Sequence, residues 1–131
     1  MDIVITEWAL DSYLDLLHGN VFARDEYKND LRPAVLKLRD YPKDPVFQNS
    51  KFWSPAVLMG AVISCGFKMK WHQVGNGKVQ LRLPVAIVGG TAFLCCAYVK
   101  ENAAKETKAL IRFEQHVELI KKSKHTERGR L

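Results

Sequence analysis

The sequence predicts a single α+β domain in which a small antiparallel sheet is accompanied by an N-terminal helical pair and a C-terminal helix. Three observations lead to this prediction. Apolar residues recur at helical spacing in two stretches before residue 41 and again between residues 102 and 122. Apolar and polar residues alternate over residues 67–84. The chain has 131 residues, 47% of them hydrophobic, which suits one domain with one core.

The first elements are expected to be a strand and two helices. Residues 2–6, DIVIT, are typical of a short strand, and Thr6 can cap a helix that stops at Gly19-Asn20. A second helical pattern covers residues 27–38. Pro33 within it indicates either a kink or a start near residue 29 or 30.

An antiparallel hairpin is expected over residues 67–84, after an ordered connection over residues 45–60. Its apolar positions are Phe67, Met69, Trp71, Val79, Leu81 and Leu83, and its polar positions are Lys68, Lys70, His72, Lys78, Gln80 and Arg82. Opposed residues of an antiparallel pair share a face, so a three-residue loop at 75–77 keeps the two sets apart. This loop opposes Trp71 to Leu81, Met69 to Leu83, Phe67 to Val85, Lys70 to Arg82, Lys68 to Pro84 and His72 to Gln80.

The meander continues with a strand over residues 91–100, after a turn at Gly89-Gly90. One of its faces carries Phe93, Cys95, Ala97 and Val99 and is the more apolar, which places Tyr98 and Lys100 with the basic side chains of the hairpin. A stripe of Leu110, Phe113, Val117 and Ile120 then predicts a helix that packs on the apolar side of the sheet. We expect the domain to span residues 1–122 and residues 123–131 to form a flexible basic tail.

The distribution of charge favours a surface that binds polyanions. The formal net charge is +6. Residues 1–44 contain six Lys or Arg against nine Asp or Glu, whereas residues 45–100 contain six against none. Solvated faces usually mix both signs, so the acid-free segment indicates a working surface. The alternative remains that the lysine row is an ordinary solvated face or protects a sheet edge from pairing.

Other kinds of site are disfavoured. Cys65, Cys95 and Cys96 form no CxxC pair, which argues against a zinc site or a disulfide framework and fits a reducing, cytoplasmic location. The four histidines are scattered, so neither a metal nor another cofactor is expected. The uncharged run at 83–99 is short and contains Pro84, which predicts buried strands and no membrane segment.

The basic face has the groups that RNA cleavage without a metal requires. A base removes the 2′-OH proton, cations stabilise the charge on the scissile phosphate, and an acid protonates the leaving oxygen. The candidate catalytic residues are Lys68, Lys70, His72, Arg82 and Tyr98. The candidate RNA-binding residues are Lys78, Gln80, Lys100, Lys121, Lys122 and Lys124. Histidine can act as acid or base near neutral pH, and arginine can hold a phosphate through two hydrogen bonds.

The chain also resembles the RelE/ParE superfamily of toxin–antitoxin toxins, most nearly its phage-derived HigB-like branch. The resemblance covers about residues 3–122. It rests on the order of elements, on RLPV at residues 82–85 and on FLCCAYVKENAAKETKALIRFEQHVELIKK at residues 93–122. It implies a RelE-like fold, with a helical pair on one face of the sheet and a concave catalytic face on the other.

The resemblance implies a function as well. The chain is expected to be the toxin of a type II toxin–antitoxin system, a metal-independent, ribosome-associated mRNA endoribonuclease that inhibits translation. Its partners would be mRNA, the ribosome and a cognate antitoxin that covers the basic face or the helical pair. Arg82 matches the strand arginine of the family, the basic strand before it matches residues 68–72, and Tyr98 or Lys100 matches the late-strand group.

Two features depart from the family, and two other functions remain open. RelE-type toxins often place a catalytic aromatic or basic residue at the C-terminus, whereas here Gly129, Arg130 and Leu131 follow a charged tail with no tyrosine, and the chain is longer through residues 41–60. The first alternative is a ParE-like toxin that inhibits DNA gyrase without nuclease activity. The second is an accessory protein that binds nucleic acid without chemistry. The presence of His72 among lysines argues against a pure binder, which needs no titrating group there.

Overall fold

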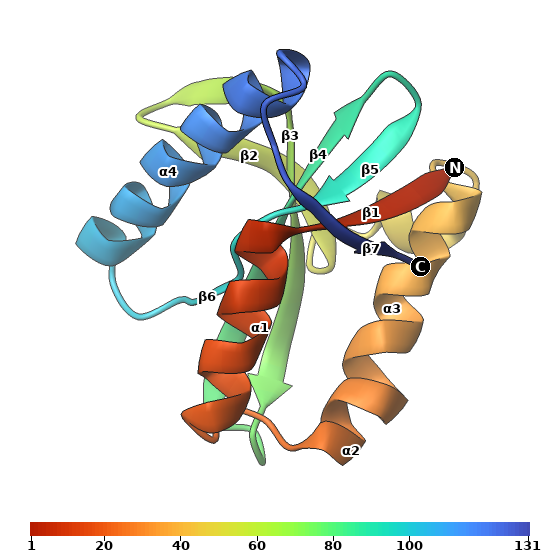
Figure 1. Ribbon diagram of the computed structural model, residues 1–131. Coiled ribbons are helices and arrows are strands. Elements are labelled where there is room, and N and C mark those ends of the chain that lie inside the picture. Colours follow the sequence, from red (N-terminus) through yellow and green to blue (C-terminus); the bar gives the residue numbers. More distant parts are fainter.

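The computed structural model describes residues 1–131 as a mixed β-sheet with helices on both faces (Figure 1). The elements in chain order are β1 (Asp2–Thr6), α1 (Glu7–His18), α2 (Arg24–Glu26), a π-helical turn (Tyr27–Leu31), α3 (Arg32–Leu36), 3₁₀ turns (Lys37–Asp40 and Pro45–Gln48), β2 (Trp53–Leu58), β3 (Ala61–Val74), β4 (Val79–Val88), β5 (Thr91–Leu94), β6 (Tyr98–Val99), α4 (Ala103–Lys121) and β7 (Glu127–Arg130). The α+β class, the N-terminal helices and the C-terminal helix are confirmed.

The sheet differs from the expected antiparallel one. It has seven strands in the order β2-β3-β4-β5-β1-β7, with β6 paired to β4 beyond β5. Strand β1 runs parallel to β5, with Asp2 opposite Thr91 and Ile5 opposite Leu94. The prediction of a purely antiparallel sheet was therefore wrong, because the N-terminal strand pairs with a segment almost 90 residues away and no local pattern shows that pairing.

The N-terminal helices form as their sequence signals predict. The Thr6 hydroxyl accepts a hydrogen bond from the Ala9 N–H at 3.2 Å and caps α1. The second helical run begins at Arg24, before the expected start, and continues to Asp40. Its π-helical turn ends at Leu31, two residues before Pro33, whose ring cannot fit into a regular α-helical ladder.

The β3–β4 hairpin has the expected register over most of its length. Phe67 pairs with Val85, Lys68 with Pro84, Met69 with Leu83, Lys70 with Arg82 and Trp71 with Leu81. The expected three-residue loop at 75–77 was wrong. Val74 pairs with Val79 across a four-residue turn, and the register shifts between Trp71 and Val74. This irregularity releases His72 from its expected position opposite Gln80.

The C-terminal helix lies on the side of the sheet opposite to the one expected. Helix α4 buries Leu110, Phe113, Val117 and Ile120 against Ala56, Ile63, Ala86 and Cys95. Gly66 permits this approach, because a Cβ atom there would lie 2.8 Å from the Phe113 ring. Gly66, Lys68 and Lys70 alternate along β3 and share a face, so α4 covers the same face as the basic side chains. On the opposite face, Met69, Leu83 and Val85 pack against Ala9 of α1, Val35 of α3 and Leu38 of the 3₁₀ turn Lys37–Asp40.

Three further segments differ from expectation. The connection at 45–60 contains β2, the edge strand that pairs with β3. The expected strand over 91–100 is interrupted, because the Ala97 N–H turns to the Ser12 hydroxyl of α1 at 2.9 Å. The expected flexible tail at 123–131 contains β7, which pairs with β1 and places Arg130 beside Asp2 at 3.5 Å. No helix is long and apolar enough to cross a membrane.

A buried histidine gives the fold a defined pH dependence. His116 of α4 is 7% exposed, and its ring stacks on Trp8 with a centroid distance of 3.8 Å and an interplanar angle of 4°. Burial, together with the smaller effect of the Arg112 charge, lowers the pKa of His116 to about 4. The neutral ring is therefore the form that the fold accommodates.

We predict that acid destabilises the wild-type protein through this residue. Below pH 6.5 the unfolded chain binds a proton at His116 that the folded chain refuses until the pH approaches about 4. The free energy of unfolding should fall by about 1–3 kcal/mol across this window. Urea unfolding at several pH values measures the loss. His116→Phe should flatten the slope, whereas the exposed His18→Gln should retain it, and an unchanged slope in His116→Phe would contradict the prediction.

Candidate functional site

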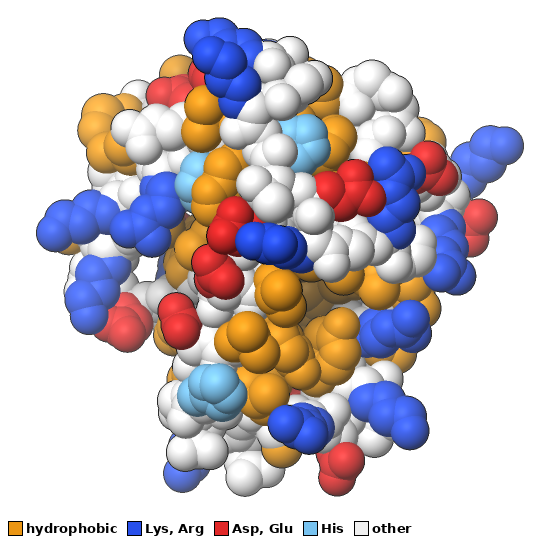
Figure 2. Space-filling view, viewed as in Figure 1, with side chains coloured by type: hydrophobic (Ala, Val, Ile, Leu, Met, Phe, Trp, Pro, Cys, Tyr) orange, Lys and Arg blue, Asp and Glu red, His pale blue; other side chains and the backbone are white.

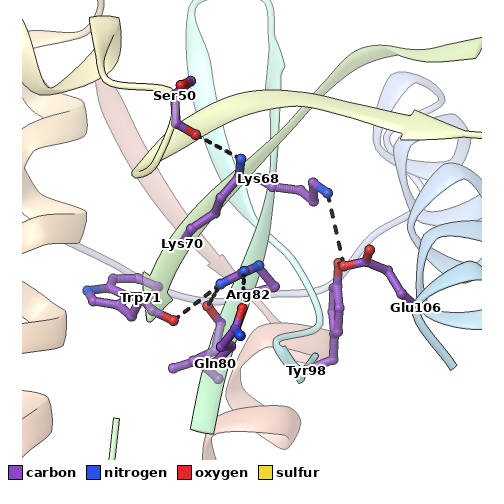
Figure 3. Close-up of polar contacts among 9 residues, drawn as sticks. Ser50, Lys68, Lys70, Trp71, Gln80, Arg82, Tyr98 and Glu106 are labelled. Carbon is purple, nitrogen blue, oxygen red and sulfur yellow. Dashed lines mark hydrogen bonds and ion pairs between the residues drawn. The ribbon is translucent and has the colours of Figure 1, made fainter. Parts of the chain in front are cut away.

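The centre of the candidate site is a group of three cations that we call the cationic cluster, made of Lys68, Lys70 and Arg82 (Figure 3). Lys68 and Lys70 project from β3, and Arg82 projects from β4 directly opposite Lys70. Tyr98 of β6 pairs with Arg82 on the other edge of β4. Four neighbouring strand positions therefore bring these side chains to one face.

Arg82 is buried without an acidic partner. It is 3% exposed, and its guanidinium donates to the carbonyls of Trp71 and Leu81 at 3.2 Å each and to the Gln80 side chain at 2.8 Å. None of the ion pairs of the chain involves Arg82. Burial lowers the pKa of Arg82, while Glu106 and Tyr98 oppose this effect. A guanidinium held by neutral acceptors keeps its full charge for an anion.

The two lysines are also partly removed from water. Burial lowers the pKa of Lys68, which Glu106 partly offsets and which the charges of Arg82 and Lys100 reinforce. Burial likewise lowers the pKa of Lys70, and the nearby cations add to the effect. The Lys70 ammonium donates to the Ser50 carbonyl at 2.9 Å. Both amines therefore release a proton more readily than a free lysine.

A carboxylate that the sequence reasoning missed completes the site. Glu106 lies in the first turn of α4, and its Oε2 accepts a hydrogen bond from the Tyr98 hydroxyl at 2.8 Å (Figure 3). The Lys68 ammonium lies 4.0 Å from the same oxygen. Burial and this hydrogen bond both raise the pKa of the Tyr98 hydroxyl. The sequence does hold a signal for this residue. Glu106 stands four residues before Leu110 and so lies one helical turn from it on the same face of α4, which is the face toward the sheet.

The structure does not bring His72 to the cationic cluster. His72 is exposed, and its Nε2 donates to the Lys51 carbonyl at 2.5 Å. No hydrogen bond or ion pair links it to Lys68, Lys70, Arg82 or Tyr98. Its proposed role as acid or base in this cluster therefore loses its geometric basis.

The predicted RNA-binding residues divide into two groups. Gln80 contacts Arg82, and Lys100 lies close enough to lower the pKa of both cluster lysines, so these two belong to the site. Lys78 lies in the β3–β4 turn, four residues beyond the Lys70–Arg82 pair and about 13 Å away. Lys121, Lys122 and Lys124 lie at the other end of α4 from Glu106, about 22 Å along the helix.

Comparison of the chain with protein-family models, with curated proteins and with solved structures gave no match. The site is therefore interpreted from its own geometry. Three cations and a tyrosine on one sheet face, together with a carboxylate from α4, can bind a phosphate and can move protons around it.

The cluster should lower the stability of the protein. Lys70 stands directly opposite Arg82 and beside Lys68, and like charges in opposed positions destabilise a sheet. We predict that Lys70→Met raises the free energy of unfolding by about 0.5 kcal/mol at low ionic strength. The gain should shrink in high salt, which screens the repulsion. Urea unfolding measures both effects, with Lys78→Met in the turn as the control. A less stable Lys70→Met variant at low salt would count against a repulsive cluster.

Proposed function

We propose that this protein is the toxin of a type II toxin–antitoxin system and that it cleaves mRNA on the ribosome with side-chain groups alone. The observation that carries the proposal is the buried Arg82, which has no acidic partner and lies between Lys70 and Tyr98 on a face that also holds Lys68. A buried cation with neutral partners is costly for folding, and an anionic substrate would supply the missing charge.

The chemistry of RNA cleavage suits these groups. A phosphate seated at the cluster would meet the Arg82 guanidinium and the two lysine ammonium groups, which would stabilise the additional charge of a pentacoordinate phosphorus. The lowered pKa of Lys68 makes its ammonium a better acid toward a leaving oxygen than an ordinary lysine. These features support the RelE-like assignment that the sequence motifs indicate.

A second candidate function follows from the position of His72. In the sequence, His72 among the lysines disfavours a non-nucleolytic toxin, because a protein that only binds needs no titrating group there. In the structure the His72 ring contacts the Lys51 carbonyl, so this objection no longer applies. A ParE-like inhibitor of DNA gyrase, or a protein that only binds nucleic acid, would use the same cationic cluster without proton transfer. End mapping of cellular RNA and DNA distinguishes these functions.

We propose that the antitoxin docks on the other side of the sheet. Figure 2 shows hydrophobic side chains around a hollow between α1 and the α2–α3 run. This cavity has a volume of about 210 Å³ and is lined entirely by hydrophobic residues, among them Leu10, Tyr13, Phe22, Trp71 and Leu81. Helix α1 carries Glu7, Asp11 and Asp15 and no Lys or Arg. These features fit a helical segment of the antitoxin with an apolar stripe in the cavity and Lys or Arg facing Asp11 and Asp15.

Growth arrest on expression tests the proposed function. We predict that Lys70→Ala and Arg82→Ala each reduce mRNA cleavage at least about 100-fold and relieve arrest, because each removes a cation from the phosphate site. His72→Ala is the matched control and should retain arrest. Mapped mRNA ends should lie within translated codons, and cleavage by purified protein on ribosomes should persist in EDTA.

Other outcomes of this experiment are equally clear. Arrest that survives both Lys70→Ala and Arg82→Ala would reject the cluster as the working site. Double-strand DNA breaks without new mRNA ends would favour the gyrase inhibitor. Binding of nucleic acid with neither kind of break would favour the accessory protein.

Rescue by the antitoxin tests the docking surface. We predict that co-expression of the antitoxin from the neighbouring reading frame restores growth and that Leu10→Arg in the toxin prevents this rescue, because the arginine would fill the apolar cavity with charge. Leu119→Arg on α4 is the control, since Leu119 is similarly apolar and lies outside the cavity. The Leu10→Arg toxin should still arrest growth when expressed alone. Full rescue of this variant would place the antitoxin elsewhere.

A further inference from the structure

Glu106 is the carboxylate in contact with the residues of the candidate site. It is joined to Tyr98 by a hydrogen bond of 2.8 Å and to Lys68 by an ion pair of 4.0 Å, and its side chain is only 19% exposed. The next acidic residue toward the N-terminus, Glu101, pairs with Lys105 on the exposed side of α4. Glu106 is therefore a component of the site and has no counterpart in the acid-free segment at 45–100.

The position of Glu106 is fixed by the packing of α4. The Asn102 side chain caps the helix by accepting from the Lys105 N–H at 2.9 Å. One turn beyond Glu106 the helix is anchored by Leu110, and two turns beyond it Phe113 rests on Gly66. The carboxylate is thus held by a rigid element, which a reacting group requires.

The hydrogen bond to Tyr98 leaves one carboxylate oxygen available. Oε2 accepts from the Tyr98 hydroxyl, while Oε1 makes no hydrogen bond within the protein. Figure 3 shows Lys68 reaching toward this carboxylate from β3, with the Tyr98 ring between Glu106 and Arg82. A ribose placed beside the Tyr98 ring would present its 2′-OH to Oε1 while its phosphate contacts the cationic cluster through Lys68, which lies 4.0 Å from the Glu106 carboxylate.

The other groups near Glu106 are less suited to act as the general base. A general base must be unprotonated when the substrate binds. Lys68, Lys70 and Arg82 are needed as cations, and the Tyr98 hydroxyl keeps its proton because its pKa is raised. His72 lies outside the cluster. Glu106 is the group of the site that can accept a proton without the loss of a cluster cation.

We propose that Glu106 is the general base of the RNA cleavage reaction, with Tyr98 as the residue that positions it. The inference rests on the proposed function. In the reaction, Oε1 of Glu106 takes the proton of the 2′-OH, and the 2′-oxygen forms a bond to phosphorus as the bond from phosphorus to the 5′-oxygen breaks. The Lys68 ammonium gives a proton to that 5′-oxygen. The products are a 2′,3′-cyclic phosphate and a 5′-OH end, and the proton on Glu106 then returns to the neighbouring Lys68 amine.

The test separates proton transfer from substrate binding. Purified Glu106→Gln should cleave ribosome-bound mRNA at least about 100-fold more slowly at the dominant wild-type site. Its affinity for the same RNA carrying a 2′-deoxy nucleotide at that site should be equal to or higher than that of the wild type, because a negative charge has been removed. Glu114→Gln, an exposed change on the same helix, should cleave at the wild-type rate. Glu106→Asp, which keeps the carboxylate, should cleave faster than Glu106→Gln.

Each result has one meaning. Cleavage by Glu106→Gln within 10-fold of the wild-type rate would overturn the inference and leave the proposed function intact. Loss of 2′-deoxy RNA binding together with cleavage would show that Glu106 supports the structure of the site, and it would also overturn the inference. Absence of cleavage by the wild-type protein would instead reject the proposed function.

Discussion

The pairing of β3 with β4 determines which chemistry appears on each side of the sheet. With Trp71 opposite Leu81, the odd-numbered side chains of residues 67–71 and 81–85 face the N-terminal helices. The same register sets Lys70 opposite Arg82 on the face that α4 covers. A shift by one residue would bury the lysines among the N-terminal helices, so the large cost of burying unpaired charges selects this register strongly.

Strand β4 is therefore covered on both faces, by the N-terminal helices on one side and by α4 on the other. Residues 81–86 are all buried, which means that both faces of the strand are covered. Five of these residues are apolar and lose nothing by burial, whereas Arg82 needs three hydrogen bonds to neutral groups to remain there. Neutral acceptors satisfy the donors of a guanidinium, and its charge is offset only in part by Glu106, which forms no ion pair with it, so the site can form and still attract an anion. A structural role alone would be served better by an apolar residue.

Sequence patterns predicted the helices and strands that have one apolar and one polar face. They failed where both faces of a strand are apolar, or where the paired segments are far apart in the sequence. The hairpin register followed from the alternation of residues 67–84, and the helices followed from their caps and stripes. The side of the sheet on which α4 packs did not follow, because the basic face becomes apolar beyond Gly66 and Ala86 and offers α4 a second surface. The pairings of β1 with β5 and β7 join distant segments, and such pairings leave no local signal.

The candidate site shows the same division. Lys68, Lys70, Arg82 and Tyr98 were predicted together because they lie on paired strands, whose geometry is regular. His72 was placed with them because an ideal hairpin has no irregularity, and the shift between Trp71 and Val74 removes it. Glu106 was missed because its place depends on how a helix docks on the sheet, which the strand pattern does not specify.

The cationic cluster and the apolar cavity lie on opposite sides of the sheet and are nevertheless built from shared residues. Trp71 and Leu81 line the cavity with their side chains, and their carbonyls accept the hydrogen bonds that hold the Arg82 guanidinium. A helix inserted into the cavity would therefore contact the two residues that position Arg82, although it would remain on the far face. The antitoxin proposed for this surface would inhibit by shifting these carbonyls, since buried hydrogen bonds to a guanidinium tolerate little displacement. Blocking the proposed access to the ribosome would be a different route to inhibition, and the two routes differ in whether free RNA still binds the cationic cluster while the proposed antitoxin is present.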